Sequence, residues 1–352
     1  MIIIKKINYL IILIFFSLIS TGCISYTELN ELGIISAIGI DVEADKFLLS
    51  TNFIIPKKEQ GESSYSTKTI TSTGKSIDEA LNNIYLSSNK KIYLSHLNFV
   101  AISEAVAKEH LEETYTFFLE NAEARNAFPI ILIKDSTPLK LLEITDKPDN
   151  ITNLLETNEE KHGTTMFISM EDFVKRLLNG NAVLPSITVK SIPEVTDLAI
   201  IKNNKLQDYL SETSSNAYLF LTNKIKEMNL TIKNKDKNIE LKVEENETII
   251  SNKKNKIFIE IKSKISSSLD QDNKKISLLY EEEIKKRIIN LLDKTKADNL
   301  DILQFSNYIK KNDYPYYKKN KSNLFKNLIY EISFKIEVLE DKAKTKRKPD
   351  YE

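Results

Sequence analysis

The sequence predicts a multidomain α+β protein, with an N-terminal mixed-sheet region followed by a C-terminal antiparallel sheet that carries a long helix. Two patterns predict this class. Up to about residue 200, short apolar runs alternate with segments of helical periodicity, which is typical of a mixed α/β layer. After about residue 205, several segments alternate apolar and polar residues, which indicates an antiparallel meander with one solvated face. A chain of 352 residues is long enough for two or three domains.

The chain after its first 32 residues begins with two predicted strands, at 33–41 and 46–55, joined by a turn. Pro56 is expected to end the second strand, because proline lacks the N–H that a strand ladder uses. Residues 57–66 are polar and predict a loop. Residues 68–73 are rich in Thr and predict a third strand.

A helix is predicted to begin after Ser76, because Ser76 and Glu79 match a capping box. Its apolar residues are expected on one face: Ala80, Leu81, Ile84 and Tyr85. A strand at 98–103, a helical segment at about 105–121 and a short buried strand at 128–134 are predicted to follow. This succession supports the mixed α/β layer.

Residues 135–180 are predicted to be mostly helical, with one helix capped by Ser169 and closed by Gly180. Pro185 and Pro193 are expected to bracket the next strand. Four further strands are predicted at 195–202, 228–233, 239–243 and 256–265.

A long amphipathic helix is predicted at about 276–294, followed by a shorter helix from Asp301. Tyr314-Pro315 should interrupt the chain, and residues 329–339 predict a final alternating strand. In the long helix, three glutamates precede Lys285, Lys286 and Arg287 and offset their charge. A solvated helix face packed on the sheet is therefore preferred to a membrane-surface helix.

The predicted domain organisation has four parts. Residues 1–22 form a cleaved signal peptide, 23–200 an N-terminal domain with room for two subdomains, and 201–340 a C-terminal α+β domain. Residues 341–352 are almost all polar or charged and predict a disordered tail.

The N-terminus has the layout of a secretory signal. Lys5 and Lys6 precede an apolar run at 9–19, and small residues up to Gly22 stand directly before Cys23. The run is short for a spanning helix, which needs about 20 residues. The segment resembles the lipobox of bacterial lipoproteins, which implies cleavage after Gly22 and a diacylglyceryl group on the Cys23 thiol.

One alternative is an uncleaved N-terminal anchor helix with an incidental Cys23. The usual lipobox has Leu where this chain has Ser20, but the sole cysteine falls where a lipobox needs it. A single cysteine also excludes an intramolecular disulfide and a cysteine-rich metal site. Two acyl chains anchor stably, because each buried CH₂ contributes about 0.8 kcal/mol. Cys23 is therefore the predicted link to membrane lipid.

The charge balance argues against a nucleic-acid partner. Lys and Arg together number 50, and Asp and Glu together number 50. Removal of residues 1–22 takes away Lys5 and Lys6 and leaves 48 basic against 50 acidic side chains. A nearly neutral body has no whole-molecule field that attracts phosphate.

The sequence contains no complete catalytic, metal-binding or cofactor-binding motif, and we therefore predict that the protein is not an enzyme and binds neither a metal nor a cofactor. Gly74-Lys75-Ser76 is similar to the end of a P-loop, but Thr69 stands where its first glycine is required. His96, His110 and His162 are far apart and form no zinc motif. Neither a nucleophile elbow nor a dinucleotide-binding glycine turn occurs.

Several segments, in order, resemble the spore germinant receptor C-subunit family, written Ger(x)C or GerAC-like. They are Glu28–Gly33 running into Ala37–Asp41, Gly74–Ser76 with Glu79–Leu81, Tyr93–Leu97, Phe117–Arg125, and Asp301–Phe305 through Tyr314-Pro315. Four departures stand out. Tyr26 replaces a usual Trp and Ser95 a usual Gly. In the fourth segment only Glu123 and Arg125 match the family pattern. The last segment lacks the family's Pro and Gly.

The resemblance implies a non-enzymatic, lipid-anchored receptor subunit built from mixed α/β domains. Its partners would be the integral membrane A- and B-type subunits, and its location the outer face of the inner spore membrane. The resemblance supplies no catalytic or ligand-binding residue. The alternative is a solute-binding lipoprotein that passes a small ligand to a transporter, and such a protein should have two lobes around a cleft. A lipid-anchored hydrolase, a third option, has no nucleophile–base motif to support it.

Overall fold

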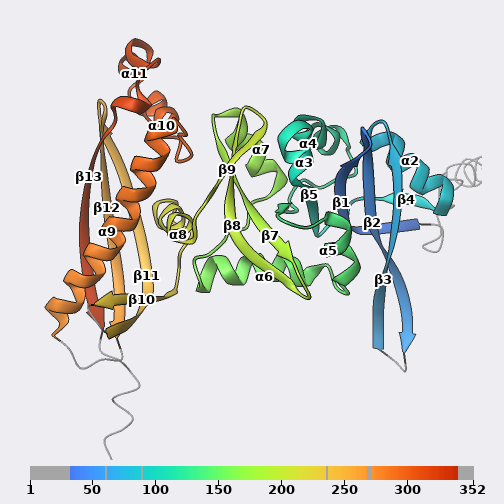
Figure 1. Cartoon of the computed structure of the whole chain (residues 1–352), viewed down its shortest axis with the longest axis horizontal. Coiled ribbons are helices and arrows are strands. Elements are labelled where there is room, and N and C mark those ends of the chain that lie inside the picture. Colours follow the sequence, from blue (N-terminus) through green and yellow to red (C-terminus); the bar gives the residue numbers. More distant parts are fainter. Residues whose placement is uncertain (1–31, 60–61, 89, 235–236, 268–271, 340–352) are drawn as a thin grey trace, which may run out of the picture.

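The computed structural model describes residues 32–59, 62–88, 90–234, 237–267 and 272–339. Two sheets are spread along an elongated molecule, with the four-stranded sheet at one end (Figure 1). The nine-stranded sheet has the order β3-β2-β1-β5-β6-β7-β8-β9, with β4 paired to β1, and the other sheet has the order β10-β11-β12-β13. The predicted α+β class, with a mixed sheet and a second sheet carrying a long helix, is confirmed.

The bounds of the strands are β1 Leu32–Glu43, β2 Lys46–Glu59, β3 Glu62–Gly74, β4 Lys91–Tyr93, β5 Phe99–Ser103, β6 Ile130–Ile133, β7 Ala182–Val189, β8 Pro193–Lys202, β9 Lys205–Leu210, β10 Met228–Asn234, β11 Lys237–Lys253, β12 Lys256–Ser267 and β13 Ile329–Leu339. The bounds of the helices are α2 Ile77–Ser88, α3 Glu104–Glu109, α4 Leu111–Glu120, α5 Pro138–Ile144, α6 Asp149–Lys161, α7 Met170–Leu178, α8 Glu212–Leu221, α9 Asn273–Ala297, α10 Phe305–Asn312 and α11 Tyr314–Asn320, with a short 3₁₀ helix at Phe325–Asn327.

The first three strands form an antiparallel hairpin series that is longer than predicted. The turn at Ala44 and Asp45 holds both residues at positive φ. Pro56 does not end β2, and the predicted loop at 57–66 belongs to the β2–β3 hairpin instead. The reason is positional: among the described residues, β1 pairs with β2 only as far as Phe53, so beyond that point no strand lies on this edge of β2 and a proline is tolerated.

The middle of the large sheet is parallel and covered on both faces. Strands β1, β5, β6 and β7 run parallel, and β5 and β6 are buried along their whole length. Alternate residues of β5 face opposite cores. Phe99 and Ala101 lie with α5 and α6, whereas Val100 and Ile102 lie in the larger core with α3, α4 and α7. This two-sided burial explains why these strands are short apolar runs.

In this region one prediction is refined and another was wrong. The helical segment at 105–121 is two helices, α3 and α4, which meet at His110. Pro185 lies inside β7 rather than before it, at a point where the register with β8 shifts between Pro185 and Ile187. A register irregularity is a usual place for a strand proline, because the ladder is interrupted there.

Helix α2 begins after Ser76, as predicted, but the returning bond from the Glu79 side chain is made to the Lys75 N–H rather than to that of Ser76. The Ser76 hydroxyl accepts from the Glu79 N–H at 3.1 Å, and the Glu79 carboxylate accepts from the Lys75 N–H at 2.6 Å. Ala80 and Ile84 are buried as predicted, but Tyr85 is 46% exposed and lies off the buried face. Ser169 likewise caps α7, by accepting from the Asp172 N–H.

The sequence predicts the change from the mixed layer to the antiparallel meander at about residue 205. The large sheet extends beyond this point, because it includes β9, which ends at Leu210. Asn203 and Asn204, both at positive φ, form the turn between β8 and β9. Strand β9 then pairs antiparallel with β8, and the second sheet begins only at Met228. Helix α8 lies between the two sheets (Figure 1). The division of the chain at residue 200 stays a prediction.

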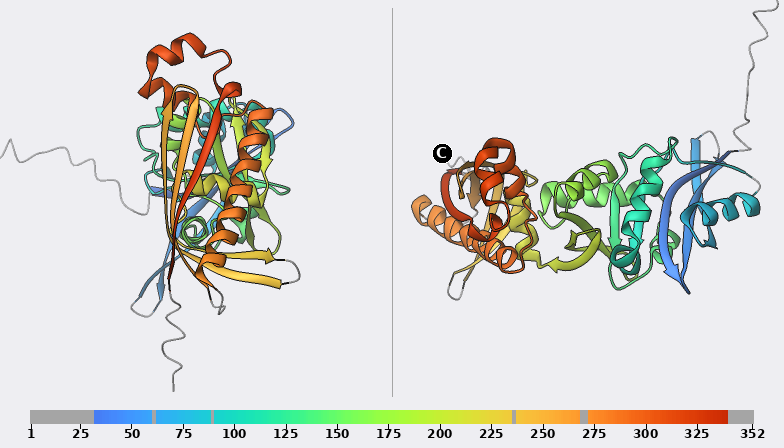
Figure 2. Two further views of the ribbon diagram at one scale, coloured as in Figure 1. Left: turned by 90° about the vertical axis from the view of Figure 1, so that its left-hand side faces the viewer. Right: turned by 90° about the horizontal axis from the view of Figure 1, so that it is seen from above.

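The second sheet is the predicted antiparallel meander with one added parallel strand. Strands β10, β11 and β12 are antiparallel, and β13 pairs parallel to β12 from Ile329 to Leu339. A parallel pair needs a crossover, which α9, α10 and α11 supply. Helix α9 packs along one face of this sheet (Figure 2). Of the apolar residues that the periodicity predicts, Ile284, Ile288, Leu291 and Leu292 are buried and Leu279 is only partly buried. Ile276 and Tyr280 are buried as well.

The crossover after α9 uses two aspartates as helix caps. Asp301 accepts from the backbone N–H groups of Phe305 and Ser306, both at 2.8 Å, at the start of α10. Asp313 caps α11 by accepting from the Tyr316 N–H, and Pro315 occupies the first turn of α11. The interruption predicted at Tyr314-Pro315 is therefore the start of a helix.

Candidate functional site

A charged cluster lies where two parallel strands of the large sheet end. Glu104 directly follows β5 and Lys134 directly follows β6. The Lys134 Nζ lies 2.6 Å from the Asp197 Oδ2 and 4.5 Å from the centre of the Tyr209 ring. The Tyr209 hydroxyl donates to the Glu104 Oε1 at 2.6 Å. The carboxyl ends of parallel strands are the usual place for ligands in open α/β sheets.

The charges of this cluster fix its protonation. Burial raises the pKa of Tyr209, and the neighbouring Glu104 carboxylate, which accepts its hydrogen bond, raises it further. The hydrogen bond to Asp197 raises the pKa of Lys134, although burial opposes this shift. The phenol therefore stays neutral and the ammonium stays charged at physiological pH. The hydrogen bond and the ion pair of the cluster link α3, β6, β8 and β9.

A hollow of 740 Å³ opens beside the cluster. Its polar lining brings Lys134, Asp135 and Asp197 together with His162, which ends α6, and Glu212, which begins α8. These side chains offer charges of both signs, which suits contact with a polar or zwitterionic surface. His162 therefore lies in a hollow beside carboxylates that the sequence did not associate with it.

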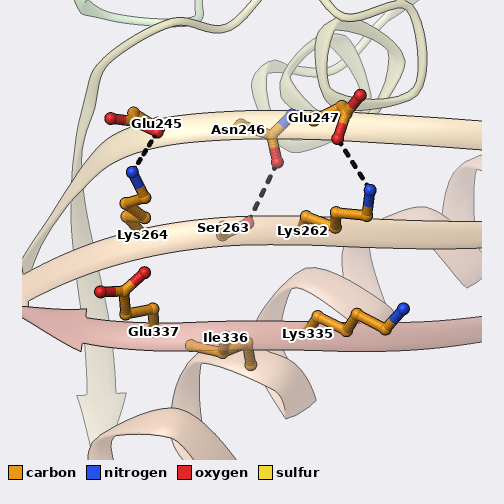
Figure 3. Close-up of a pocket in the computed structure, with 9 residues that line it drawn as sticks. All are labelled: Glu245, Asn246, Glu247, Lys262, Ser263, Lys264, Lys335, Ile336 and Glu337. Carbon is orange, nitrogen blue, oxygen red and sulfur yellow. Dashed lines mark hydrogen bonds and ion pairs between the residues drawn. The ribbon is translucent and has the colours of Figure 1, made fainter.

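A second hollow, of 520 Å³, lies on the second sheet and is lined by three neighbouring strands (Figure 3). Two cross-strand ion pairs join β11 to β12 there: Glu245 to Lys264 at 2.7 Å, and Glu247 to Lys262 at 3.0 Å. Between them the Ser263 hydroxyl donates to the Asn246 Oδ1 at 3.1 Å. The paired charges join neighbouring strands and form a charged surface on this sheet.

The two residues predicted for processing, Gly22 and Cys23, lie outside the described residues. His96 is exposed, and its ring centre lies 5.8 Å from that of Tyr93. His110 packs edge-on against Phe47, and its Nδ1 lies 3.5 Å from a Glu113 carboxylate oxygen. Within the described ranges, no group of three or more His, Cys, Asp or Glu side chains is arranged to hold a metal ion.

The Gly74-Lys75-Ser76 triplet is a helix cap and not a phosphate cradle. A side chain at Gly74 would meet the backbone of α2, with its Cβ only 2.3 Å from the Ala80 nitrogen. The Lys75 N–H, which a P-loop would offer to phosphate, already donates to the Glu79 carboxylate. Close packing and capping thus explain both the glycine and the serine of the triplet.

Two of the family-like segments meet in space. The Ser95 hydroxyl, in the segment that contains His96, donates to the backbone oxygen of Glu123 at 2.9 Å. In the first segment, Gly39 faces α5 so closely that a Cβ would lie 2.8 Å from the Pro138 Cβ. The residues of these segments are therefore restricted by their contacts within the fold: a hydrogen bond between segments at Ser95, and close packing against α5 at Gly39.

Sequence reasoning missed Gln304, which joins the crossover to the large sheet. Its backbone has φ 57°, the left-handed region, and its Nε2 donates to the backbone oxygens of Arg176 at 2.6 Å and Asn181 at 3.1 Å. The resemblance offered a signal, because the related segments have Gly at this position. Nearby, burial raises the pKa of the Asp301 carboxyl, although the backbone N–H groups of Ser306 and Phe305 donate to it.

None of the helices that the structure describes has the length and the apolar composition needed to cross a membrane.

Comparison with known proteins gives consistent results over most of the chain. Residues 25–189 match the family model "Spore germination protein N-terminal domain", and residues 196–341 match "Spore germination B3/GerAC like, C-terminal". The chain is 24% identical to spore germination protein KC of Bacillus subtilis (strain 168), over 94% of this chain and 93% of that protein. The crystal structure of the GerBC protein has a similar fold, with a TM-score of 0.58 at 14% identity, covering 86% of this chain and 96% of that one. The chain therefore belongs to the GerAC-like family of spore germination proteins, as a C-subunit of the Ger(x)C type.

Proposed function

We propose that this chain is the lipid-anchored, non-enzymatic subunit of a spore nutrient germinant receptor. It is held by lipid on Cys23 at the outer face of the inner spore membrane. There it acts through protein–protein contacts with the integral membrane A- and B-type subunits to trigger germination. The observation that carries the proposal is the order of the two family matches, which begin at residue 25, two residues after the lipobox-like cysteine.

The surface chemistry of the described residues supports a role in contacts. The charged side chains of the second sheet are paired across strands, and the cluster near Lys134 pairs that lysine with Asp197 and the Tyr209 hydroxyl with Glu104. Such surfaces recognise partners by shape and charge pattern, with paired rim charges setting orientation more than affinity.

The lipid anchor is tested by replacing the cysteine. Cys23→Ala should move the protein from the membrane fraction of spores to the soluble fraction and reduce germination, because the two acyl chains are lost. Ser20→Leu is the matched control, since it restores the usual lipobox and keeps the thiol; it should stay membrane-bound. If Cys23→Ala were fully retained and active, the anchor proposal would be wrong and an uncleaved N-terminal helix would be favoured.

The partner proposal needs a separate measurement. Affinity purification of the tagged chain from detergent-solubilised spore membranes should recover the A- and B-type subunits. Deletion of the gene should abolish germination to at least one nutrient and leave vegetative growth unchanged. Recovery of a transporter in place of these subunits would instead favour the solute-binding alternative.

A further inference from the structure

We propose that the C-terminal end of α2, together with the start of β4, rests directly on the lipid bilayer. We call this surface the α2 end surface and define it by Tyr85, Leu86, Lys90 and Lys91. The inference rests on the lipid anchor proposed above and adds a second membrane contact, made by the folded domain itself. Its occupant is the headgroup and upper acyl region of an anionic bilayer.

The α2 end surface exposes apolar side chains beside cations. Leu86 is 74% exposed and Tyr85 is 46% exposed, both near the end of α2. Lys90 and Lys91 lie shortly after the end of α2 and are exposed as well. The acidic residues of this helix, Asp78 and Glu79, lie in its first turn, at the opposite end. An aromatic and an aliphatic side chain flanked by lysines is the composition of a membrane-interface contact.

The pairing of β4 places this surface at the entry of the chain into the fold. Lys91 is the partner of Leu32, the first residue of β1, in a parallel pair. A Cβ at Gly33 would lie 3.2 Å from the Lys90 Cβ, so the two segments are in close contact. In Figure 1 and in the right-hand view of Figure 2, α2 lies at the outer end of the molecule, away from the second sheet.

The length of chain between the anchor and the fold limits how far this end can move. Cys23 and Leu32 are nine positions apart in the sequence. At no more than about 3.6 Å for each residue, the start of β1 stays within roughly 30 Å of the lipidated sulfur. The α2 end surface, next to Leu32, is therefore held near the bilayer, whereas the second sheet lies at the far end of the long axis.

The anchor makes a weak surface contact effective. Each lysine near an anionic surface contributes about 1 kcal/mol, a modest amount for a freely diffusing protein. A tether converts the contact into an intramolecular event with a high effective concentration. The near-neutral charge of the whole chain does not oppose this, because the lysines act within a Debye length of the surface.

The absence of tryptophan from the sequence allows a clean test. Leu86→Trp places a fluorescent probe on the surface, and Leu178→Trp, at a leucine in α7 that is 76% exposed, is the matched control. The full lipidated chain is reconstituted in vesicles of phosphatidylglycerol and phosphatidylcholine with brominated acyl chains. We expect Leu86→Trp fluorescence to shift to shorter wavelength and to be quenched, and Leu178→Trp fluorescence to remain unchanged.

Charge reversal then tests the lysines. Lys90→Glu combined with Lys91→Glu, in the Leu86→Trp background, should reduce the quenching, and should do so more strongly in phosphatidylglycerol vesicles than in phosphatidylcholine alone. Circular dichroism checks that each variant keeps its fold. Equal quenching of the Leu86→Trp and Leu178→Trp variants would overturn the proposal. So would quenching of Leu86→Trp that is unchanged when Lys90 and Lys91 are replaced by glutamate.

Flotation separates this inference from the anchor. If the Leu86→Trp chain floats with the vesicles but its fluorescence is not quenched, the lipid anchor is present and the proposed surface contact is wrong. The exposed end of α2 would then be a candidate contact for a protein partner. A chain that does not float refutes the lipid anchor itself. Floating together with selective quenching supports both.

Discussion

Gln304 shows how one residue can replace a glycine at a structural cost. Its left-handed backbone, at φ 57°, is less favourable for an L residue by about 1–2 kcal/mol, a penalty that glycine avoids. The side chain offsets the cost, because its Nε2 donates to the backbone oxygens of both Arg176 and Asn181. Those oxygens belong to α7 and to the residue before β7, so Gln304 links the α9–α10 connection to the large sheet.

This balance predicts different outcomes for two substitutions. Gln304→Ala keeps the backbone cost and loses both hydrogen bonds, and should lower the free energy of unfolding by about 1–3 kcal/mol. Gln304→Gly loses the same bonds but relieves the backbone, and should lower it by about 1 kcal/mol less than alanine does. Urea denaturation followed by circular dichroism measures the difference. Equal losses would show that the left-handed conformation costs little here.

At the scale of elements, α9 is joined to its sheet by a buried polar chain as well as by apolar packing. The Tyr280 hydroxyl donates to the Ser263 Oγ at 2.9 Å, and Ser263 donates to the Asn246 Oδ1 of the neighbouring strand (Figure 3). Tyr280 is fully buried, and burial raises its pKa, so the phenol remains a donor. The chain fixes the position of the helix along β12.

Tyr280→Phe tests this link. It should lower the free energy of unfolding by about 1 kcal/mol, because the Ser263 oxygen loses its donor in a buried site. Tyr85→Phe, at an exposed tyrosine, is the control and should change stability by less than about 0.5 kcal/mol. Thermal or urea unfolding measures both. A loss no larger than that of the control would mean that water replaces the hydroxyl.

Local signals predicted the elements well, and long-range pairing explains what they missed. The helix cap at Ser76 and the apolar face of α9 depend only on residues that are close together in the sequence, and both were confirmed. Pro56 and Pro185 were read as strand ends, although the surrounding pairing tolerates them within β2 and β7. The parallel direction of β13 and the role of Gln304 depend on contacts with distant segments, which one sequence does not reveal.

At the scale of the whole molecule, α8 joins the two sheets. Every residue from Ser214 to Leu221 is buried. The Ser215 hydroxyl accepts from the Leu198 N–H of β8 at 3.3 Å, and the Phe220 oxygen accepts from the Thr248 hydroxyl of β11 at 2.8 Å. The larger hydrophobic core accordingly runs from the first strands to β12 without a break. The two sheets are therefore expected to unfold together, as one cooperative unit.

Leu219→Ala should therefore destabilise both sheets together. Leu219 is fully buried, and its truncation leaves a cavity that costs about 2–5 kcal/mol. Hydrogen exchange should show the same loss of protection in β8 and in β12, and unfolding should remain a single transition. Leu178→Ala, at an exposed leucine, should leave exchange unchanged. Faster exchange in one sheet alone would show that the sheets unfold independently.

The parallel pairing of β13 with β12 also determines the order in which the second sheet can form during synthesis and folding. β12 ends at Ser267, but its neighbour begins only at Ile329, so the pair must wait until the intervening helices have been synthesised and packed. Closing such a long loop slows folding. Until then β12 is an open edge that can pair with other chains. A truncation before Ile329 would leave β12 permanently at the edge of the sheet, a position that β13 takes in the strand order of the described residues. The last strand therefore determines which strand the sheet presents to other chains.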